Sequence, residues 1–134
     1  MRAHVIGNVA LDETIRVDDL PVPGASILGV ELSRDIGGKG ANQAVVLGRA
    51  GLSCRLVAPV GRDSRAADIR AALAGEPVEA LLVEVDGVRS DISLILMTAG
   101  GENVIVTTNE AAFLLSPDAA VAILAEAVAT PGTP

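Results

Sequence analysis

Continuous apolar runs in this chain of 134 residues predict a set of buried strands. Such runs occupy residues 3–9, 54–60 and 78–85. Runs of this length without polar alternation are typical of strands that are covered on both faces, as in a parallel sheet between layers of helices.

A second pattern, in which apolar and polar residues alternate, predicts strands with one solvent-exposed face. It covers residues 14–18 and part of 27–36, with two prolines and a glycine between them, and it returns at 92–96 and 104–106 around Gly100-Gly101. The two pairs therefore predict four strands that form one small accessory sheet, separate from the buried one.

Helices are predicted between these strands. One covers residues 41–50 and ends at Gly51, where a glycine is a favourable C-cap; Gly48 inside it indicates close packing onto the sheet. A second covers residues 64–74, with Asp63 or Ser64 as its cap. A third starts at Ser116-Pro117, a favourable N-cap followed by proline. Alternation of buried strands and helices predicts an α/β fold.

Composition and charge exclude several function classes. The net charge is −7, there is no basic run, and a single phenylalanine is the only aromatic residue, so nucleic acid is a poor partner. The apolar runs are too short to span a membrane, and the N-terminus lacks the apolar segment of a signal peptide. One cysteine, Cys54, cannot form an internal disulfide and is predicted to be buried. We expect a soluble, cytoplasmic protein.

The stretch Gly37-Gly38-Lys39-Gly40 is the strongest candidate for chemistry. It has three glycines in four positions, and it leads into a helix N-terminus, where unpaired N–H groups attract oxygen-rich ligands. Lys39 is the only lysine, against nine arginines. The stretch fits neither GxxxxGK[ST] nor GxGxxG, so it does not predict a nucleoside triphosphate cradle. It predicts a small-molecule site, and the alternative is a glycine turn that serves only tight packing.

Three further polar residues lie within or just after predicted strands. Asp12 follows the first buried strand, where ligands of open α/β sheets bind, although a solvated turn aspartate has the same position. His4, the only histidine, lies inside the first strand without a second ligand nearby, which favours a structural role. Asp63 follows another strand end, and capping a helix is its favoured role over ligand binding.

These segments together resemble the N-terminal half of the ribokinase-like (PfkB family) carbohydrate kinases. The most specific part is Gly37-Gly38-Lys39-Gly40-Ala41-Asn42-Gln43-Ala44; Val60-Gly61-x-Asp63, Gly101-Glu102-Asn103 and Leu115-Ser116-Pro117 follow in the family's order. The resemblance implies a Rossmann-like parallel sheet with helices on both faces and a small β-sheet lid, here built from about residues 13–36 and 91–108, in a truncated form.

The resemblance also implies a function. Family members transfer the γ-phosphoryl group of ATP, with Mg²⁺, to a hydroxyl group of a sugar or nucleoside, and their lid often forms a homodimer contact. Carried onto this chain, Asp12 would accept hydrogen bonds from two sugar hydroxyls. Gly38 would let the sugar approach the backbone, and Lys39 and Asn42 would donate to its oxygens.

Two departures from the family pattern bear on substrate and activity. Ala10 replaces a frequent asparagine and Glu110-Ala111-Ala112 replaces Gly-Ala-Asn, which affects the choice of sugar. The catalytic aspartate of the family lies in a Gly-Ala-Gly-Asp-type motif, which this chain lacks. Residues 1–134 are therefore expected to be the N-terminal part of one domain, without catalytic residues, metal ligands or nucleotide pocket, and inactive alone.

Three hypotheses follow. The first is the sugar-binding and lid part of an ATP-dependent sugar kinase. The second is a non-catalytic sugar-binding or dimerising half-domain. The third is a nucleoside kinase of the same family, which ranks below sugars because the predicted lid strands hold no aromatic residue for a purine.

Overall fold

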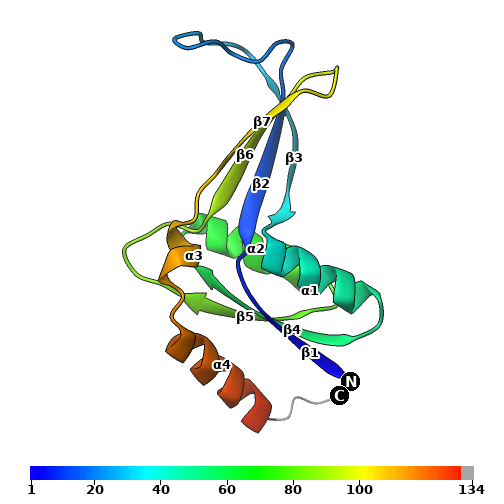
Figure 1. The fold of residues 1–134 in the computed structure, drawn as a ribbon, viewed down its shortest axis with the longest axis vertical. Helices are drawn as coiled ribbons and strands as arrows, with labels where there is room; N and C mark the ends of the chain where they lie inside the picture. Colours follow the sequence, from blue (N-terminus) through cyan, green and yellow to red (C-terminus); the bar gives the residue numbers. More distant parts are fainter. Residues whose placement is uncertain (131–134) are drawn as a thin grey trace.

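The buried apolar runs form a three-stranded parallel sheet in the computed structural model, which describes residues 1–130 (Figure 1). Its order is β1 (Arg2–Ile6), β4 (Ser53–Val60) and β5 (Glu79–Glu84), so β4 lies in the middle. Seven of the eight residues of β4 are buried, as expected for a strand covered on both faces.

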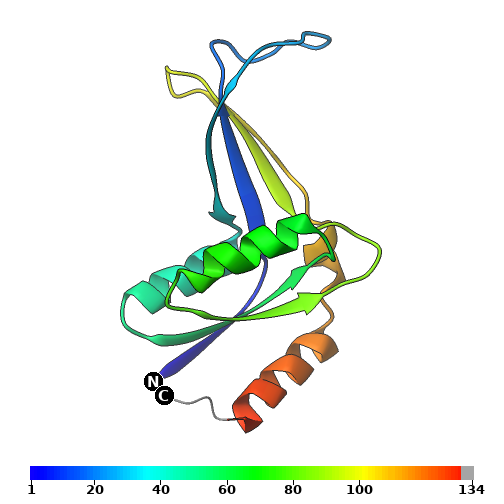
Figure 2. The same ribbon diagram turned by 180° about the vertical axis from the view of Figure 1, so that it is seen from behind.

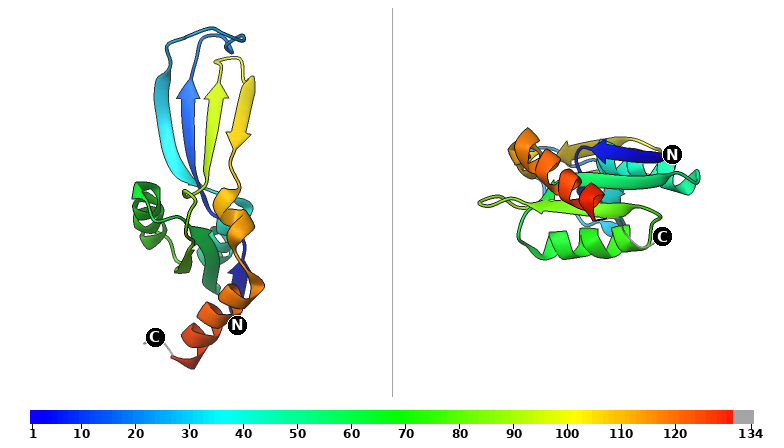
Figure 3. Two further views of the ribbon diagram at one scale, coloured as in Figure 1. Left: turned by 90° about the vertical axis from the view of Figure 1, so that its left-hand side faces the viewer. Right: turned by 90° about the horizontal axis from the view of Figure 1, so that it is seen from below.

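Helices cover both faces of this sheet (Figure 3). The first pair packs on one face and the second pair on the other, and the four helices are α1 (Lys39–Arg49), α2 (Ser64–Ala74), α3 (Glu110–Leu114) and α4 (Pro117–Ala129). Alternate residues of β4 face the two helix layers. Cys54 and Leu56 pack into the core with α1 and α2, whereas the Arg55 side chain reaches α4. The parallel α/β architecture predicted from the sequence is confirmed.

The core between the parallel sheet and the α1–α2 layer is made of small and branched aliphatic side chains. Its fully buried members from β4 and the two helices include Ala41, Ala44, Leu56, Ile69 and Leu73, and Val9 adds to them from the connection between β1 and β2. None of the helices within residues 1–130 is long and apolar enough to cross a membrane.

The alternating strands form a second, four-stranded sheet, which we call the accessory sheet. Its order is β3-β2-β6-β7, and its strands are β2 (Ala10–Arg16), β3 (Val30–Gly37), β6 (Ile92–Met97) and β7 (Asn103–Thr107). Each predicted pair is antiparallel, and the two pairs meet along the parallel β2–β6 contact. The sheet projects away from the parallel sheet in both views (Figures 1 and 2).

The predicted starts of α2 and α4 are confirmed by their caps, and the predicted end of α1 is confirmed by Gly51. The Asp63 carboxylate accepts a hydrogen bond from the Ala66 N–H at 2.9 Å, and the Ser116 hydroxyl accepts one from the Ala119 N–H at 3.1 Å. Gly51, just after α1, has a φ of 96°, which a residue with a side chain rarely adopts.

Three expectations need correction. β1 ends at Ile6 and β2 begins at Ala10, so Asp12 lies inside a strand and not in a turn. Gly48 packs against the carbonyl group of Pro77, in the loop before β5, and not against the sheet. Lys39 is the first residue of α1, whereas it was expected in the loop.

Candidate functional site

The glycine stretch joins the end of β3 to the start of α1. Gly37 is the last residue of β3, and Gly38 is the N-cap of α1 with a φ of 92°. A Cβ on Gly38 would also lie 2.9 Å from the Asn8 carbonyl oxygen and 3.0 Å from the Val9 Cα. Both the backbone angle and the close approach of the β1–β2 connection therefore require glycine here.

Asn8 occupies much of the α1 N-terminus. Its Oδ1 accepts a hydrogen bond from the Gly40 N–H at 3.1 Å, and its carbonyl oxygen accepts one from the Ala41 N–H at 3.0 Å. Two of the N–H groups that the sequence assigned to a ligand are thus already bonded within the chain. Tight packing, the alternative interpretation of the glycines, accounts for Gly40, because a Cβ there would lie 2.7 Å from the Asn8 nitrogen.

Asp12 is the third residue of β2, and its carboxylate lies over Gly37. A side chain on Gly37 would overlap both carboxylate oxygens. Oδ1 of Asp12 is fully buried and has no hydrogen-bond partner among the described residues. Burial raises the pKa of Asp12 above its usual value; the nearby Ser93 hydroxyl lowers it and the negative charge of Asp35 raises it further. A buried oxygen without a partner is the feature expected of a group that binds a ligand donor.

Asp12 belongs to a row of polar residues that crosses the accessory sheet. Asp35 on β3 and Ser93 on β6 are its direct neighbours in the ladder, and Thr107 on β7 is the neighbour of Ser93. Direct neighbours share a face, so all four side chains lie on one face of the sheet. The hydroxyl groups of Ser93 and Thr107 are 2.9 Å apart and bond to each other. The row therefore offers oxygen atoms on one side of the sheet, next to the glycine stretch.

Lys39 and Asn42 lie in the first turn of α1, and both side chains are exposed. The Asn42 N–H donates to the Gly38 carbonyl oxygen at 2.9 Å, which fixes this turn next to the glycines. Asn42 also lines a hollow of about 440 Å³ with residues of β3 and α2, and Asp12 is not among the residues that line it. The structure thus places Gly37 against the Asp12 carboxylate, and Gly38 against the connection between β1 and β2. No hydrogen bond within residues 1–130 connects the Lys39 or Asn42 side chain to Asp12.

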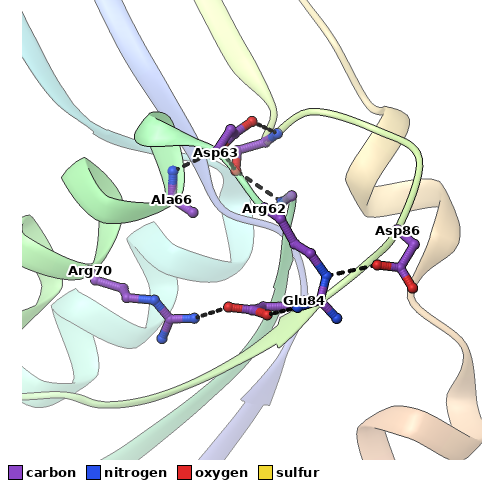
Figure 4. Close-up of polar contacts among 8 residues, drawn as sticks. Arg62, Asp63, Ala66, Arg70, Glu84 and Asp86 are labelled. Carbon is purple, nitrogen blue, oxygen red and sulfur yellow. Dashed lines mark hydrogen bonds and ion pairs between the residues drawn. The ribbon is translucent and has the colours of Figure 1, made fainter.

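A buried polar junction that the sequence did not predict joins the accessory sheet to the core. Asp63 caps α2 through the Ala66 N–H (Figure 4). Its carboxylate also accepts from the Ser90 N–H and hydroxyl, each at 2.7 Å. Asp91, only 2% exposed, accepts from the Thr108 hydroxyl at 3.0 Å and from the Ala112 N–H at 2.8 Å. These bonds fix the starts of β6 and α3 relative to the end of β4.

Two observations bear on metal and phosphate binding by the described residues. No group of three or more His, Cys, Asp or Glu side chains within residues 1–130 is arranged to hold a metal ion. The glycine stretch, the only phosphate-cradle candidate in the sequence, has part of its helix N-terminus filled by Asn8. The feature of these residues that points most directly to a ligand is the buried Oδ1 of Asp12, which has no hydrogen-bond partner among them.

Comparison with known proteins places this arrangement in a family. A sequence model described as pfkB family carbohydrate kinase matches residues 2–130. The chain belongs to the PfkB family. The resemblance drawn from the glycine stretch and the later motifs is therefore confirmed, and so is the ribokinase-like fold.

Ribokinases are among the similar PfkB proteins. The ribokinase of Bacillus subtilis is 32% identical over 103 residues, which cover 76% of this chain and 35% of that protein. The structure of the Giardia lamblia ribokinase matches with a TM-score of 0.81 at 28% identity, over 92% of this chain and 38% of that one. A Cryptococcus neoformans ribokinase in complex with ADP matches with a TM-score of 0.69 at 32% identity, over 82% of this chain and 34% of that one.

The match covers most of this chain but only part of each PfkB relative. Nearly all of this chain is matched, but it spans only about a third of the length of the curated ribokinases.

Proposed function

We propose that this chain is the sugar-binding and lid part of an ATP-dependent sugar kinase. Residues 1–134 would form the N-terminal part of one ribokinase-like domain. The accessory sheet, which includes the segments 13–36 and 91–108, would act as the lid. Asp12 would accept hydrogen bonds from sugar hydroxyls, Gly38 would admit the sugar to the backbone, and Lys39 and Asn42 would donate to its oxygens.

The buried, unpartnered Oδ1 of Asp12 is the observation that supports this proposal most directly. Leaving a buried acceptor without a donor costs about 1–3 kcal/mol, so the chain retains the carboxylate at an energetic cost. A sugar hydroxyl would supply the missing donor, and a hydrogen bond to a charged group contributes about 1.5–3 kcal/mol. Lys39 and Asn42, which are exposed in the first turn of α1, would supply donors in return.

Calorimetric titration of the chain with a panel of pentoses and hexoses tests the proposal. We expect one saturable site for at least one sugar, weakened about tenfold or more by Asp12→Asn, because the charged acceptor is lost. Asp19→Asn, an exposed aspartate in the loop after β2, is the matched control and should bind as the wild type does. Sugar binding that is unchanged by Asp12→Asn would contradict the assignment.

The ATP and Mg²⁺ of the proposed reaction would be held mainly by residues outside 1–130, within which no three His, Cys, Asp or Glu side chains are arranged to hold a metal ion. The Cryptococcus neoformans relative was solved with ADP, which supports nucleotide use in the family. We therefore expect no sugar-dependent ADP formation from this chain alone. Sugar-dependent turnover that Asp12→Ala abolishes would overturn that expectation.

The same titrations also distinguish the two alternative hypotheses, a non-catalytic sugar-binding half-domain and a nucleoside kinase. Sugar binding that persists while no preparation containing this chain shows kinase activity would favour a non-catalytic sugar-binding module. Binding of nucleosides in clear preference to free sugars would favour a nucleoside kinase.

Association of two chains through the accessory sheet is supported by its exposed apolar residues. Five apolar side chains on β3 and β7 are between 42% and 60% exposed: Val30, Leu32, Val104, Ile105 and Val106. These residues lie on the two edge strands of the sheet, and exposed apolar side chains at such edges are available for contact with another chain. We expect a homodimer by light scattering that Ile105→Glu converts to a monomer; a wild-type monomer at high concentration would contradict it.

A further inference from the structure

Two consecutive polar residues, Ser90 and Asp91, lie where the chain passes from the parallel sheet into the accessory sheet. They directly precede β6 and are buried, Ser90 with an exposure of 0% and Asp91 with 2%. Buried polar side chains are costly unless their hydrogen bonds are formed. The partners of these two residues therefore show what holds the accessory sheet at its base.

Every polar group of Ser90 bonds to the end of β4 or the start of α2. Its N–H and its hydroxyl each donate to the Asp63 carboxylate at 2.7 Å. Its hydroxyl oxygen accepts from the Gly61 N–H at 2.9 Å, and its carbonyl oxygen accepts from the Arg65 side chain at 3.3 Å. A side chain on Gly61 would overlap the Val88 carbonyl oxygen, so the two segments are also in close contact. Ser90 is thus fixed to the core.

The bonds of Asp91, by contrast, go to the accessory sheet and to α3. Its carbonyl oxygen accepts from the Leu11 N–H on β2 at 3.0 Å. Its carboxylate accepts from the Thr108 hydroxyl, just after β7, and from two N–H groups in the first turn of α3. Two adjacent residues therefore connect the core to the accessory sheet, one bonded to each side.

This connection leads to the proposed sugar acceptor. Asp12 directly follows Leu11, and its ladder neighbour Ser93 stands two residues after Asp91 on β6. A displacement of the Ser90–Asp91 pair would therefore reach the Asp12 carboxylate through β2 and β6 together. Precise placement matters at such a site, because a small misplacement of a contact weakens it strongly.

Asp63 makes more bonds than an N-cap requires. Its bond to the Ala66 N–H at 2.9 Å already caps α2, and the two bonds from Ser90 are additional. Burial raises the pKa of Asp63, but the bonds from Ser90 and Ala66 outweigh burial and hold the pKa below its ordinary value. Asp63 is therefore charged at neutral pH, and hydrogen bonds to a charged acceptor are the stronger ones.

We infer that Asp63 is a positioning residue for the Asp12 carboxylate, which it fixes relative to the core through Ser90 and Asp91. It contacts no ligand itself. The consequence for sugar binding rests on the proposed function, whereas the placement of the carboxylate depends only on the bonds described above.

Two substitutions in the 134-residue chain test this role. Asp63→Asn keeps the cap, because its amide oxygen can accept from Ala66, but it turns an NH₂ group against the Ser90 N–H. Ser90→Ala removes the hydroxyl bonds without changing any charge. In both variants the pKa of Asp12 should fall toward its ordinary value, because its carboxylate becomes less buried. NMR titration of ¹³C-labelled aspartate carboxyl groups measures this pKa, with the Asp12 signal identified by Asp12→Asn. Sugar binding by calorimetry should weaken about tenfold.

Ser116→Ala is the control, because it also removes an N-cap bond, the one to the Ala119 N–H within α4. It should lower the urea midpoint and leave the pKa of Asp12 unchanged. Three results would overturn the positioning role: an unchanged pKa of Asp12 in both Asp63→Asn and Ser90→Ala, a change in Asp63→Asn alone, which its lost charge would explain, or an equal change in Ser116→Ala. If the pKa falls in both variants but the wild type binds no sugar, Asp63 still positions the carboxylate and the proposed function is contradicted.

Discussion

Asp12, the proposed acceptor for a sugar, has an energetic cost to the fold. Its Oδ1 is buried without a partner, and burial together with the charge of Asp35 raises its pKa. An acid whose pKa is raised by folding binds its proton more tightly in the native state. The proton-linked stability is therefore fully present below the unfolded-state pKa of about 3.9 and is lost as the pH rises through the folded-state value.

Asp12→Asn should consequently stabilise the protein at neutral pH, because the neutral amide avoids the cost of the buried charge. In urea unfolding from pH 3.5 to 7, we expect the variant and the wild type to be similar at the acid end and to diverge as the pH rises. Asp35→Asn should reduce the divergence, because Asp35 is one cause of the raised pKa. A wild type more stable than Asp12→Asn at pH 7 would show that the carboxylate has a donor that the structure lacks.

Gly37 is a glycine because of Asp12, which a double-mutant cycle can show. Its φ is not positive, so its backbone tolerates alanine, but the new methyl group would overlap the Asp12 carboxylate. We expect Gly37→Ala to cost about 1–3 kcal/mol in urea unfolding, and much less in an Asp12→Ala background.

Gly100→Ala is the matched control for Gly37→Ala. Gly100 also lacks a positive φ, and the nearest atom to its added Cβ is the Thr98 hydroxyl oxygen at 3.8 Å. The control should be neutral or slightly stabilising. An equal cost of Gly37→Ala in both Asp12 backgrounds would refute the dependence on Asp12.

At the scale of elements, α4 is fixed to the sheet by a buried arginine. Arg55 is 3% exposed; its Nε lies 2.6 Å from the Glu79 carboxylate, and it also donates to the Ala127 carbonyl at the end of α4. Glu79, by contrast, is 50% exposed. Removing the Glu79 carboxylate therefore leaves a buried cation without a counter-charge, whereas removing Arg55 leaves a carboxylate that is half exposed to solvent.

Glu79→Gln should destabilise the protein more than Arg55→Met, because it leaves a buried cation without its counter-charge, whereas methionine removes the charge and keeps the aliphatic packing. We expect a cost of about 1–3 kcal/mol for Glu79→Gln in thermal and urea unfolding. Arg55→Met should instead increase hydrogen exchange at the end of α4. The reverse order of stabilities would mean that the ion pair contributes little and the helix contact dominates.

The elements that the sequence predicted are those whose signals are local. The caps Asp63 and Ser116 lie within three residues of the N–H groups they bind, so α2 and α4 were predicted with their starts. α3 was missed because its N-terminal N–H groups bind Asp91, about twenty residues earlier in the chain, and the Asn109 side chain forms no cap hydrogen bond.

The start of β2 was missed for a related reason. Ala10 and Leu11 are both buried at the junction of the two sheets, which breaks the alternation expected of a strand with one exposed face. Asp12 was nonetheless selected from its place after an apolar run, and the glycine stretch from its composition. Two features of the site could not be predicted from local patterns: the Oδ1 of Asp12 has no partner, and Asn8 occupies the N-terminus of α1. Both depend on contacts between segments about thirty residues apart in the chain.

At the scale of the whole molecule, burial is distributed unevenly between the two sheets. All five residues of β7 are exposed, whereas seven of the eight residues of β4 are buried. The accessory sheet projects from the core and is fixed at its base by the Ser90–Asp91 junction and by the glycine stretch (Figures 1 and 2). A segment with few buried apolar contacts and exposed backbone hydrogen bonds can open locally, at a free energy below that of global unfolding.

Native-state hydrogen exchange at low urea should therefore detect two levels of stability. We expect amides of β6 and β7 to exchange through an opening at least about 2 kcal/mol below that of β4, which should exchange only on global unfolding. β5 is the control, because it is also an edge strand but belongs to the parallel sheet, and it should follow β4 more closely than β7 does.

Under the proposed function, a sugar bound between Asp12 and the first turn of α1 should slow hydrogen exchange in β2 and β3 first, because a ligand stabilises only the states that bind it. A single exchange free energy for both sheets would show that the accessory sheet cannot open while the core stays folded, and a lid that moves independently of the core would then be ruled out.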